Sequence, residues 1–272
     1  MTHTTTGTIL DRILAQTTAD VAVRKGRRPQ AEIEAAAANR PVSASLYERL
    51  AEPGMSVIAE IKRASPSRGV FPVDVDPAMV AGEYIAGGAS GISVLTDEPF
   101  FQGSLQDMEA AAAVAHLAPR PVPILRKDFI VDEYQIVEAR AHGADAILLI
   151  VAALPDDRFR ALFAKAIEWG LDALVEVHDE HEMIRAAAAG ARLIGINNRD
   201  LKSFTVDLAT TERLAPLAPR EAVIVAESGV FGPAEIQRLS SAGADAVLVG
   251  EGVITAVDRS AAVRKLWSAV EA

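Results

Sequence analysis

The sequence predicts an α/β protein, a single (β/α)₈ TIM barrel that follows an N-terminal helical extension. The chain has 272 residues, and one such barrel typically needs about 250. Short runs rich in Val, Ile and Leu alternate with helical patterns, as in a parallel sheet covered on its outer face. A helix end, a Gly-Ala turn and an apolar run recur together at 86–95, 141–150, 188–196 and 241–249.

Residues 1–50 are expected to form the extension, packed on the barrel, and residues 51–272 the barrel itself. In the extension, Ile9, Leu10, Ile13, Leu14 and Val21 recur at helical spacing, and 31–39 and 45–51 have the pattern of two shorter helices. The eight strands are expected at 57–61, 91–96, 122–126, 145–151, 172–177, 192–197, 222–227 and 245–249. Helices between them include 156–169, 180–189 and 233–242.

Eight parallel strands favour closure into a barrel over an open sheet. No Gly-x-Gly-x-x-Gly follows the first strand, and this absence disfavours a dinucleotide-binding fold.

Composition excludes several classes of function. The formal charge of −10 argues against nucleic acid as a partner, because phosphate backbones require a basic face. The basic patch at 24–28 is therefore expected to be solvated. The chain has no cysteine, which excludes disulfides, thiolate metal sites and a cysteine nucleophile. We expect a cytoplasmic protein that does not bind membranes, because there is no secretory signal and the longest apolar run, 146–154, is far too short to span a bilayer.

Charged side chains follow the predicted strands at their carboxyl ends, where barrel active sites lie. Glu60 and Lys62 are two residues apart and therefore share one face of the first strand. The later strands end in Arg126, Lys127 and Asp128, in Glu176 and His178, in Asn197 and Arg199, and in Glu227. Surface ion pairs contribute little stability, so this ring of charges indicates a catalytic rim.

The last two strands end in glycine turns, Ser228-Gly229 and Gly250-Glu251-Gly252. Glycine allows backbone N–H groups to approach an anion, and many barrels bind a substrate phosphate at these strands. Left-handed turns also require glycine, so the turns alone are weak support. Their place in the barrel favours phosphate binding.

A set of motifs in one order carries a family resemblance over residues 56–255. The motifs are Glu60-Ile-Lys62 with Ser65-Pro66-Ser67, Phe100-Phe-Gln-Gly-Ser104, Leu125-Arg-Lys-Asp-Phe129, Leu148-Leu-Ile150, Leu174-Val-Glu-Val177, Gly195-Ile-Asn-Asn-Arg-Asp-Leu201 and Ala226-Glu-Ser-Gly229. The chain closely resembles indole-3-glycerol phosphate synthases, the ring-closing enzymes of tryptophan biosynthesis. The resemblance implies the substrate 1-(2-carboxyphenylamino)-1-deoxyribulose 5-phosphate and the products indole-3-glycerol phosphate, CO₂ and water.

The resemblance also implies roles for residues. Lys127 is the expected general acid at the ketone and Glu176 the usual base, while the division of acid–base work among Glu176, Glu60 and Lys62 stays open. Asn197 and Glu227 are expected to bind sugar hydroxyls and to orient Lys127. The remaining candidates fall into three sets. Phosphate binding is expected from Lys62, Arg199, Ser228, Gly229 and Gly250. A loop with Ser65, Pro66 and Ser67 is expected to cover the substrate, and an apolar pocket of Phe101, Phe129 and Leu148 is expected to hold its aromatic ring.

Two positions depart from the pattern of many relatives. Glu251 stands where serine is common, and a carboxylate would repel phosphate, so its side chain is expected to turn away. His178 stands where asparagine is frequent, and we expect a supporting polar role rather than metal binding, because no neighbouring pair has ligand spacing.

Other functions remain as alternatives. A Schiff-base aldolase could use Lys127 if its amine were neutral, and a catalytically silent phosphate-binding barrel is a further possibility. Phosphoribosylanthranilate isomerases, by resemblance, need a cysteine at the first strand, which this chain lacks. We expect a monomer without metal or organic cofactor, acting on a small phosphorylated and carboxylated substrate, whose activity EDTA leaves unchanged.

Overall fold

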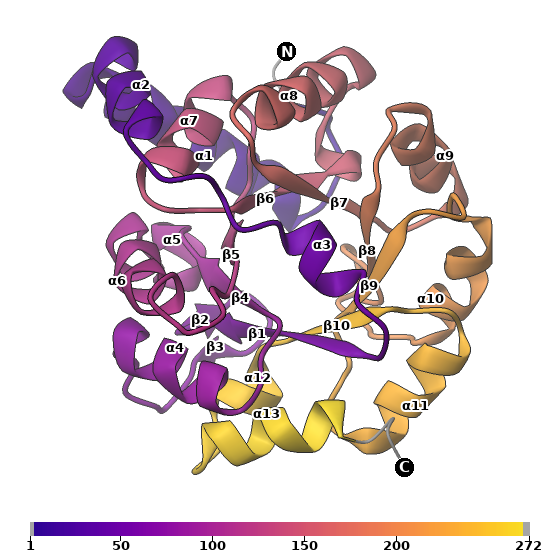
Figure 1. Cartoon of the computed structure of the whole chain (residues 1–272). Helices are drawn as coiled ribbons and strands as arrows, with labels where there is room; N and C mark the ends of the chain where they lie inside the picture. The colour runs from indigo at the N-terminus through magenta and orange to yellow at the C-terminus, as the bar shows by residue number, and fades with distance from the viewer. Residues whose placement is uncertain (1–2, 269–272) are drawn as a thin grey trace.

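The computed structural model describes residues 3–268, which form a closed barrel of eight parallel strands ringed by helices (Figure 1). Each strand pairs with the barrel strands that precede and follow it in sequence, and the last closes onto the first. The barrel strands are β1 Ser56–Ile61, β4 Gly91–Leu95, β5 Ile124–Lys127, β6 Ala146–Ile150, β7 Asp172–Val177, β8 Leu193–Asn197, β9 Val223–Glu227 and β10 Ala246–Val249. The predicted fold class and the positions of all eight strands are confirmed.

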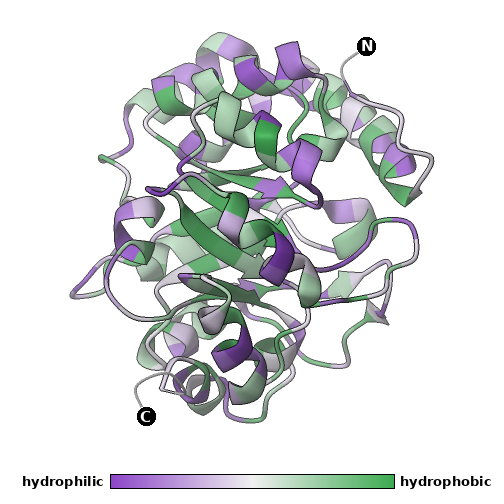
Figure 2. Cartoon of the chain, turned by 90° about the vertical axis from the view of Figure 1, so that its right-hand side faces the viewer, coloured by the Kyte–Doolittle hydropathy of each residue, from purple (hydrophilic) through white to green (hydrophobic). Residues whose placement is uncertain are grey.

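The helices cover the outer face of the barrel, so that apolar strands occupy the centre and hydrophilic residues the periphery (Figure 2). They are α1 Ile9–Arg27, α2 Gln30–Ala38, α3 Leu46–Leu50, α4 Pro77–Ala86, α5 Glu98–Phe101, α6 Leu105–Ala115, α7 Glu133–Ala141, α8 Asp156–Glu168, α9 Glu180–Ala188, α10 Ala209–Leu214, α11 Pro233–Ser241, α12 Glu251–Ile254 and α13 Arg259–Trp267.

The repeated Gly-Ala turns end helices as the sequence predicts. Gly88, Gly143, Gly190 and Gly243 all have positive φ, between 81° and 96°. A residue with a side chain rarely adopts this left-handed conformation, which is why glycine recurs just after the helix. The turn then leads directly into the next buried strand.

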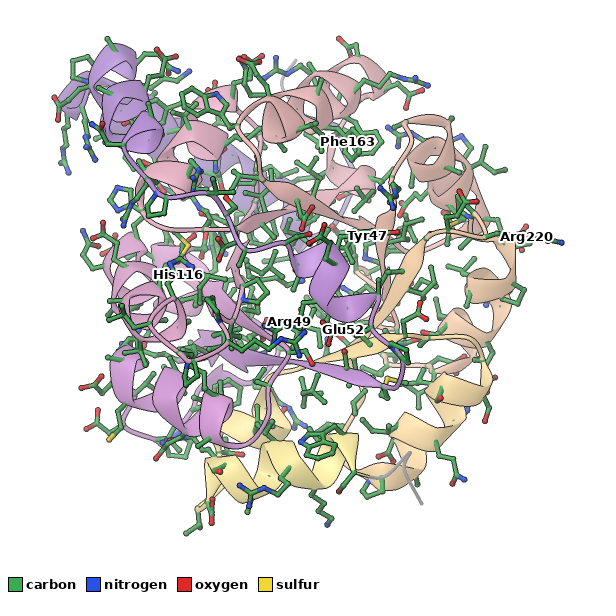
Figure 3. The ribbon with its side chains drawn as sticks, in the orientation of Figure 1. Tyr47, Arg49, Glu52, His116, Phe163 and Arg220 are labelled. Carbon is green, nitrogen blue, oxygen red and sulfur yellow. The ribbon has the colours of Figure 1, made fainter. Side chains whose placement is uncertain are left out.

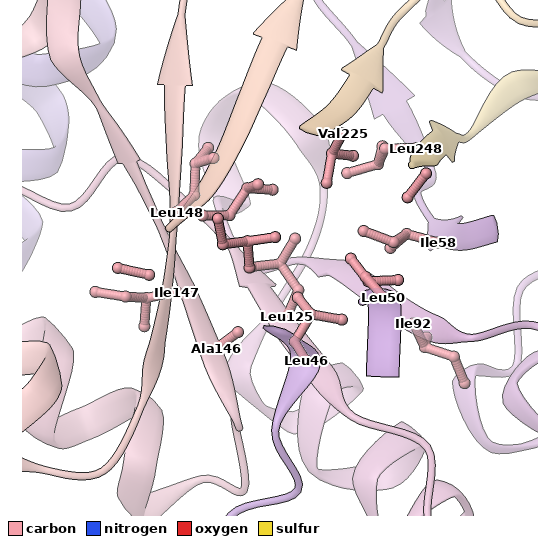
Figure 4. Close-up of a cluster of buried hydrophobic side chains, with 14 of the residues drawn as sticks. Leu46, Leu50, Ile58, Ile92, Leu125, Ala146, Ile147, Leu148, Val225 and Leu248 are labelled. Atoms are coloured by element: carbon pink, nitrogen blue, oxygen red, sulfur yellow. The ribbon is translucent and has the colours of Figure 1, made fainter. Parts of the chain in front are cut away.

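Alternate residues of each strand point into the barrel, and the short helix α3 closes the amino-terminal end of that interior. Leu46 and Leu50 of α3 are fully buried, and Figure 4 shows them directed toward Ile58, Leu125 and other inward side chains of the strands. Burial of a leucine side chain stabilises the fold by about 1.5–3 kcal/mol. The extension therefore completes the core.

Hydrogen bonds fix α3 and the segment before it to the barrel. Asp145 accepts from the backbone N–H of Ala44 at 2.9 Å. Asp172 accepts from the hydroxyl of Ser45 and from the N–H of Tyr47, both at 2.9 Å. Figure 3 shows Tyr47, Arg49 and Glu52 beside α3 at this end, where the guanidinium of Arg49 donates to the Pro121 carbonyl at 2.7 Å.

The first helix reaches the opposite end of the barrel. Leu10 and Ile13 of α1 are buried and line the cleft described below. The basic patch at the end of α1 is not simply solvated, because Lys25 pairs with Asp132 at 2.7 Å and Arg24 with Glu138 at 3.0 Å. The extension thus contacts both ends of the barrel. We propose that the boundary between the extension and the barrel domain lies at residue 50. Residues 269–272 of the expected barrel domain lie outside the described residues.

Candidate active site

A cleft opens at the carboxyl ends of the strands, and every residue that the sequence nominated for catalysis or binding lines it. Because the strands are parallel, their carboxyl ends meet at one end of the barrel. The residues are Glu60, Lys62, Ser65, Pro66, Ser67, Phe101, Lys127, Phe129, Leu148, Glu176, Asn197, Arg199, Glu227, Ser228, Gly229, Gly250 and Glu251.

Lys127 lies between two carboxylates inside the cleft. Its Nζ is 2.5 Å from Oε2 of Glu227 and 3.1 Å from Oε2 of Glu176. Burial lowers the pKa of Lys127, but the surrounding carboxylates, Glu227 first, outweigh burial and raise it above its ordinary value. Lys127 is therefore an ammonium group at neutral pH.

The two carboxylates that share Lys127 have opposite proton affinities. Burial raises the pKa of Glu176, but Lys127 and His178 outweigh burial and hold that pKa well below its ordinary value. Burial and the charge of Glu176 raise the pKa of Glu227 to about 7, although Lys127 acts in the opposite sense. Glu176 is thus ionised at neutral pH, while Glu227 can hold a proton.

The carboxylate of Glu227 occupies space that a glycine leaves open. A Cβ added to Gly195 of β8 would collide with Oε1 of Glu227. This oxygen is buried and has no hydrogen-bond partner among residues 3–268. Any residue larger than glycine at position 195 would displace the carboxylate that binds Lys127.

The first strand contributes a second ion pair. Nζ of Lys62 is 2.7 Å from Oε1 of Glu60, and the hydroxyl of Ser93 donates to Oε2 of Glu60 at 3.3 Å. A Cβ on Gly250 would lie 2.6 Å from Oε1 of Glu60 and 2.8 Å from Nζ of Lys62. A side chain at position 250 would therefore displace this ion pair, a constraint that the sequence alone does not reveal.

Asn197 organises the neighbouring turn. Its side-chain oxygen accepts from the N–H of Arg199 and from the hydroxyl of Ser228, both at 3.0 Å. Ser228 has φ of 67° and Gly229 has φ of 86°, so two left-handed residues follow β9. Such strain in a residue other than glycine is concentrated at functional sites. Glu227 thus contacts Lys127, whereas Asn197 hydrogen-bonds to two of the phosphate candidates, Arg199 and Ser228.

The loop after β1 folds over this side of the cleft. The sequence predicted a covering loop here, and within it β2 Ala64–Ser65 and β3 Gly69–Val70 pair as a small antiparallel hairpin. Nε of Arg68 is 3.1 Å from Oε2 of Glu251. Glu251 is therefore neutralised by a cation from the covering loop, rather than simply turned away as expected.

The opposite side of the cleft is apolar. The rings of Phe101 and Phe129 have centroids 6.0 Å apart, and Leu148 lies on the same wall. Sequence reasoning missed the contributions of Leu10 and Ile13 from α1. Their helical spacing indicated a buried face but gave no information about which end of the barrel that face covers.

One charged residue of the predicted rim, Arg126, does not line the cleft. Arg126 is 1% exposed and points away from the barrel interior, pairing with Asp128 at 2.8 Å and Glu138 at 3.0 Å. It is adjacent to Lys127, and neighbouring residues of a strand face opposite sides. Arg126 is thus part of a structural network between β5 and α7, and the alternation of the strand could have revealed this.

His178 contacts carboxylates, as a supporting role requires. Nδ1 lies 3.0 Å from Glu182, and Nε2 lies 3.3 Å from Glu176. Between residues 3 and 268, no group of three His, Cys, Asp or Glu side chains is arranged to hold a metal ion. No helix in that range is long and apolar enough to cross a membrane.

Comparison with known proteins identifies similar sequences along almost the whole chain. The model of the family described as indole-3-glycerol phosphate synthase matches residues 10–266. A protein of that name from Rhodococcus jostii (strain RHA1) is 51% identical over 262 residues, covering 96% of each chain. One from Roseiflexus sp. (strain RS-1) is 49% identical over 263 residues, covering 95% of this chain and 98% of the relative.

Solved structures at lower identity share the fold. Thiamine phosphate pyrophosphorylase from Pyrococcus furiosus superposes with a TM-score of 0.61 at 18% identity, over 84% of this chain and 98% of the other. A 3-hexulose-6-phosphate synthase gives a TM-score of 0.58 at 17% identity, over 79% of this chain and all of the other. At these identities the likeness concerns the barrel alone.

Proposed function

Because the chain belongs to the indole-3-glycerol phosphate synthase family, we propose that the charged cluster around Lys127 carries out the ring closure of that reaction. The chain acts on a small phosphorylated substrate, and its activity is that of a carboxy-lyase in tryptophan biosynthesis. The substrate is 1-(2-carboxyphenylamino)-1-deoxyribulose 5-phosphate. The observation that carries the assignment of residues is the buried ammonium of Lys127 between Glu176 and Glu227.

The first step joins the ring carbon that bears the carboxylate to the ketone carbon. Electrons of the carbonyl double bond move to its oxygen, and Lys127 donates a proton there, so no free alkoxide forms. Loss of CO₂ returns the electron pair of the broken C–C bond to the ring. The apolar wall of Phe101, Phe129 and Leu148 supports this step, because it offers a flat surface for the aromatic ring.

The second step removes water. The new hydroxyl leaves with a proton supplied by an acid, and a base takes a proton from the adjacent carbon as the double bond of the five-membered ring forms. We assign the base to Glu176, because it is ionised and adjacent to Lys127. Glu60 and Lys62 form the second acid–base pair of the cleft, and Glu227 holds Lys127 in place.

We assign the phosphate to the turns after β9 and β10. Ser228, Gly229 and Gly250 supply hydroxyl and backbone donors, while Lys62 and Arg199 supply charge. Ser65, Pro66 and Ser67 of the hairpin loop cover this side, and Asn197 fixes the orientation of Arg199 and Ser228. The substrate carboxylate is lost as CO₂, so it does not need a permanent partner.

The pKa of Lys127 argues against a Schiff-base aldolase. Such an enzyme needs a neutral amine, and its lysine pKa is lowered. Here the carboxylates raise the pKa of Lys127, although burial alone would lower it. Borohydride reduction in the presence of substrate should therefore leave no adduct on Lys127.

Turnover of the carboxyphenylamino substrate, followed by indole fluorescence, tests the function directly. Formation of indole-3-glycerol phosphate with release of one CO₂ per turnover is the expected result. An inactive protein that still binds phosphate would favour the silent barrel instead. We further propose a cytoplasmic monomer that acts without metal, cofactor or nucleic acid, which size-exclusion chromatography and activity in EDTA can check.

A further inference from the structure

His178 lies directly beside the proposed base, yet the reaction scheme gives it no part. Glu176 and His178 are two residues apart at the end of β7, so their side chains point to the same side. Nε2 of His178 is 3.3 Å from Oε1 of Glu176. Oε2 of the same carboxylate is 3.1 Å from Nζ of Lys127. Each oxygen of Glu176 therefore faces a different cation-forming group.

Glu182 of α9 fixes the imidazole in this position. Its Oε2 accepts from the backbone N–H of His178 at 2.8 Å and lies 3.0 Å from Nδ1 of the ring. Glu182 is itself held by Asp179, which caps α9 and accepts from the N–H of Glu182 at 2.8 Å. The start of the helix thus sets the orientation of the ring.

Both ring nitrogens of His178 lie near carboxylates: Nδ1 is hydrogen-bonded to Glu182, and Nε2 is within ion-pair distance of Glu176 without forming a hydrogen bond to a described residue. Two carboxylates in these positions favour the doubly protonated imidazole. The charged groups in contact with it are Glu176 from β7 and Glu182 from α9. Burial lowers the pKa of His178, but these two carboxylates outweigh burial and raise the pKa to about 10. At neutral pH the side chain is therefore an imidazolium, next to Glu176.

The imidazolium of His178 gives the two carboxylates around Lys127 unequal amounts of positive charge nearby. Glu176 faces both Lys127 and His178, whereas Glu227 faces Lys127 and keeps one oxygen without a hydrogen-bond partner among the described residues. Where two buried carboxyl groups compete for one cation, the proton resides on the one with less positive charge nearby. Unequal surroundings of this kind separate an acid from a base.

We propose that His178 is a positioning residue, resting on the function proposed above: its imidazolium holds Glu176 as the ionised base and leaves the proton of the carboxylate pair on Glu227. When Lys127 gives its proton to the ketone oxygen, Glu176 loses the positive charge on one side but keeps that of His178. It therefore stays ionised until the proton on the adjacent carbon must be removed.

The test is the pH profile of kcat for His178→Asn, a neutral replacement that can still hydrogen-bond. An opposite charge within about 4–6 Å lowers a carboxyl pKa by roughly 1–3 units. Without that charge, the proton that the carboxylate pair holds below the Glu227 pKa of about 7 can move to Glu176. The acidic limb of the profile should therefore move to higher pH by about one unit or more. Turnover should fall much more at pH 6 than at pH 8, with KM little changed, because His178 does not line the cleft.

Two further variants separate this role from a structural one. His116→Asn removes a histidine paired with a buried carboxylate, Asp145, at the other end of the barrel, and should leave the profile unchanged. Glu182→Gln should shift the profile in the same direction as His178→Asn but less. Because Glu182 acts through His178, the double variant should match His178→Asn alone.

Outcomes for His178 and for the proposed function are distinguishable. A wild-type protein without synthase turnover would refute the function, whereas normal wild-type turnover with superimposable pH profiles would refute only the role of His178. NMR of the imidazole carbons in the wild-type protein provides a second readout, should His178→Asn fail to fold. Signals of a doubly protonated ring from pH 6 to pH 9 are expected, and a neutral ring at pH 7 would overturn the inference.

Discussion

Both ends of the barrel contain buried carboxylates, but these carboxylates have different partners: mainly backbone N–H groups at one end and lysine side chains at the other. At the amino-terminal end, Asp145 accepts from the backbone N–H groups of Ala44 and Ile124 at 2.9 and 2.8 Å. Asp245, which is exposed, accepts from Ile224 N–H at 2.8 Å in the corresponding Gly-Ala-Asp repeat. At the carboxyl end, Glu60, Glu176 and Glu227 instead face lysine side chains.

This difference separates carboxylates that stabilise from carboxylates that can react. A backbone N–H is a fixed donor that does not titrate, so the aspartates at the closed end connect strands and the extension. Asp145 has an additional partner in His116, whose Nε2 lies 2.7 Å away, but it faces no lysine in the described residues. An ammonium can lose its proton and a carboxylate can gain one, so the cluster at the open end can move protons. The cleft also leaves Oε1 of Glu227 without a hydrogen-bond partner among the described residues, a cost that function rather than stability explains.

Replacing Lys127 should produce the largest effect. Lys127→Ala removes the proposed acid, and a placed general acid typically contributes on the order of 10²–10⁴ in rate. We expect kcat to fall by about that factor while the far-ultraviolet circular dichroism remains that of the wild type. Lys165→Ala, on the outer helix α8, removes a lysine that pairs with Glu168 away from the cleft; it is the matched control and should retain full turnover. Near-normal turnover of Lys127→Ala would transfer the acid role to Lys62.

The closed end should respond to mutation in the opposite way. Asp145→Ala leaves the N–H groups of Ala44 and Ile124 without their acceptor, and a buried unsatisfied donor costs about 1–3 kcal/mol. We expect the free energy of unfolding in urea to fall by about 2–4 kcal/mol, with kcat per folded molecule unchanged. A comparable loss of kcat would mean that the two ends are coupled, and the comparison drawn here would fail.

The phosphate side of the open end should affect binding more than chemistry. Arg199→Ala removes a cation that interacts with the phosphate about equally in the ground and transition states, so KM should rise more than kcat falls. We expect a rise of about tenfold or more, because charged hydrogen bonds contribute roughly 1.5–3 kcal/mol. Inorganic sulfate should compete with substrate, and a crystal grown in it should show an anion near Gly229 and Gly250. An unchanged KM with an anion elsewhere would exclude this site.

Most of the fold can be predicted from the sequence, because buried parallel strands are continuous apolar runs that end in recognisable turns. Val57 to Ile61 and the seven later runs form the barrel strands at the predicted places. The same logic brings residues at strand ends, such as Lys127 and Glu227, to one cleft, because parallel strands share their carboxyl end. These features follow from local pattern and topology together.

Contacts between elements distant in the sequence could not be predicted. The apolar spacing of Leu10 and Ile13 indicates a buried helix face, but only the tertiary structure places it over the cleft. The pairing of Arg68 with Glu251 joins a loop and a turn that are 183 residues apart. Pairings of this kind depend on how the chain closes, and one sequence without structure does not specify them.

Protonation of Glu227 should have the smallest effect, measured as a change in the free energy of unfolding with pH. It also allows a direct comparison of Glu227 with Glu176 at the open end. Burial and Glu176 raise the pKa of Glu227 to about 7 from an ordinary value of 4.5, although Lys127 acts in the opposite sense. Between these two pH values the folded state holds a proton that the unfolded state has released. The contribution of Glu227 to stability is therefore present below pH 4.5 and is lost as pH rises to about 7.

Glu227→Gln removes this loss, since a glutamine does not titrate. The free energy of unfolding of the variant, measured in urea and relative to wild type, should rise between pH 5 and pH 8. We expect a rise on the order of 1 kcal/mol, since one unit of pKa shift corresponds to about 1.4 kcal/mol. Glu176→Gln is the comparison variant. Although burial raises the pKa of Glu176, Lys127 and His178 outweigh burial and keep it well below its ordinary value, so Glu176 itself does not titrate above pH 5. Its charge helps to raise the pKa of Glu227, so Glu176→Gln should give a rise of the same sign as Glu227→Gln but smaller. A flat difference for Glu227→Gln would mean that Glu227 is ionised throughout, and the assignment of the shared proton would be wrong.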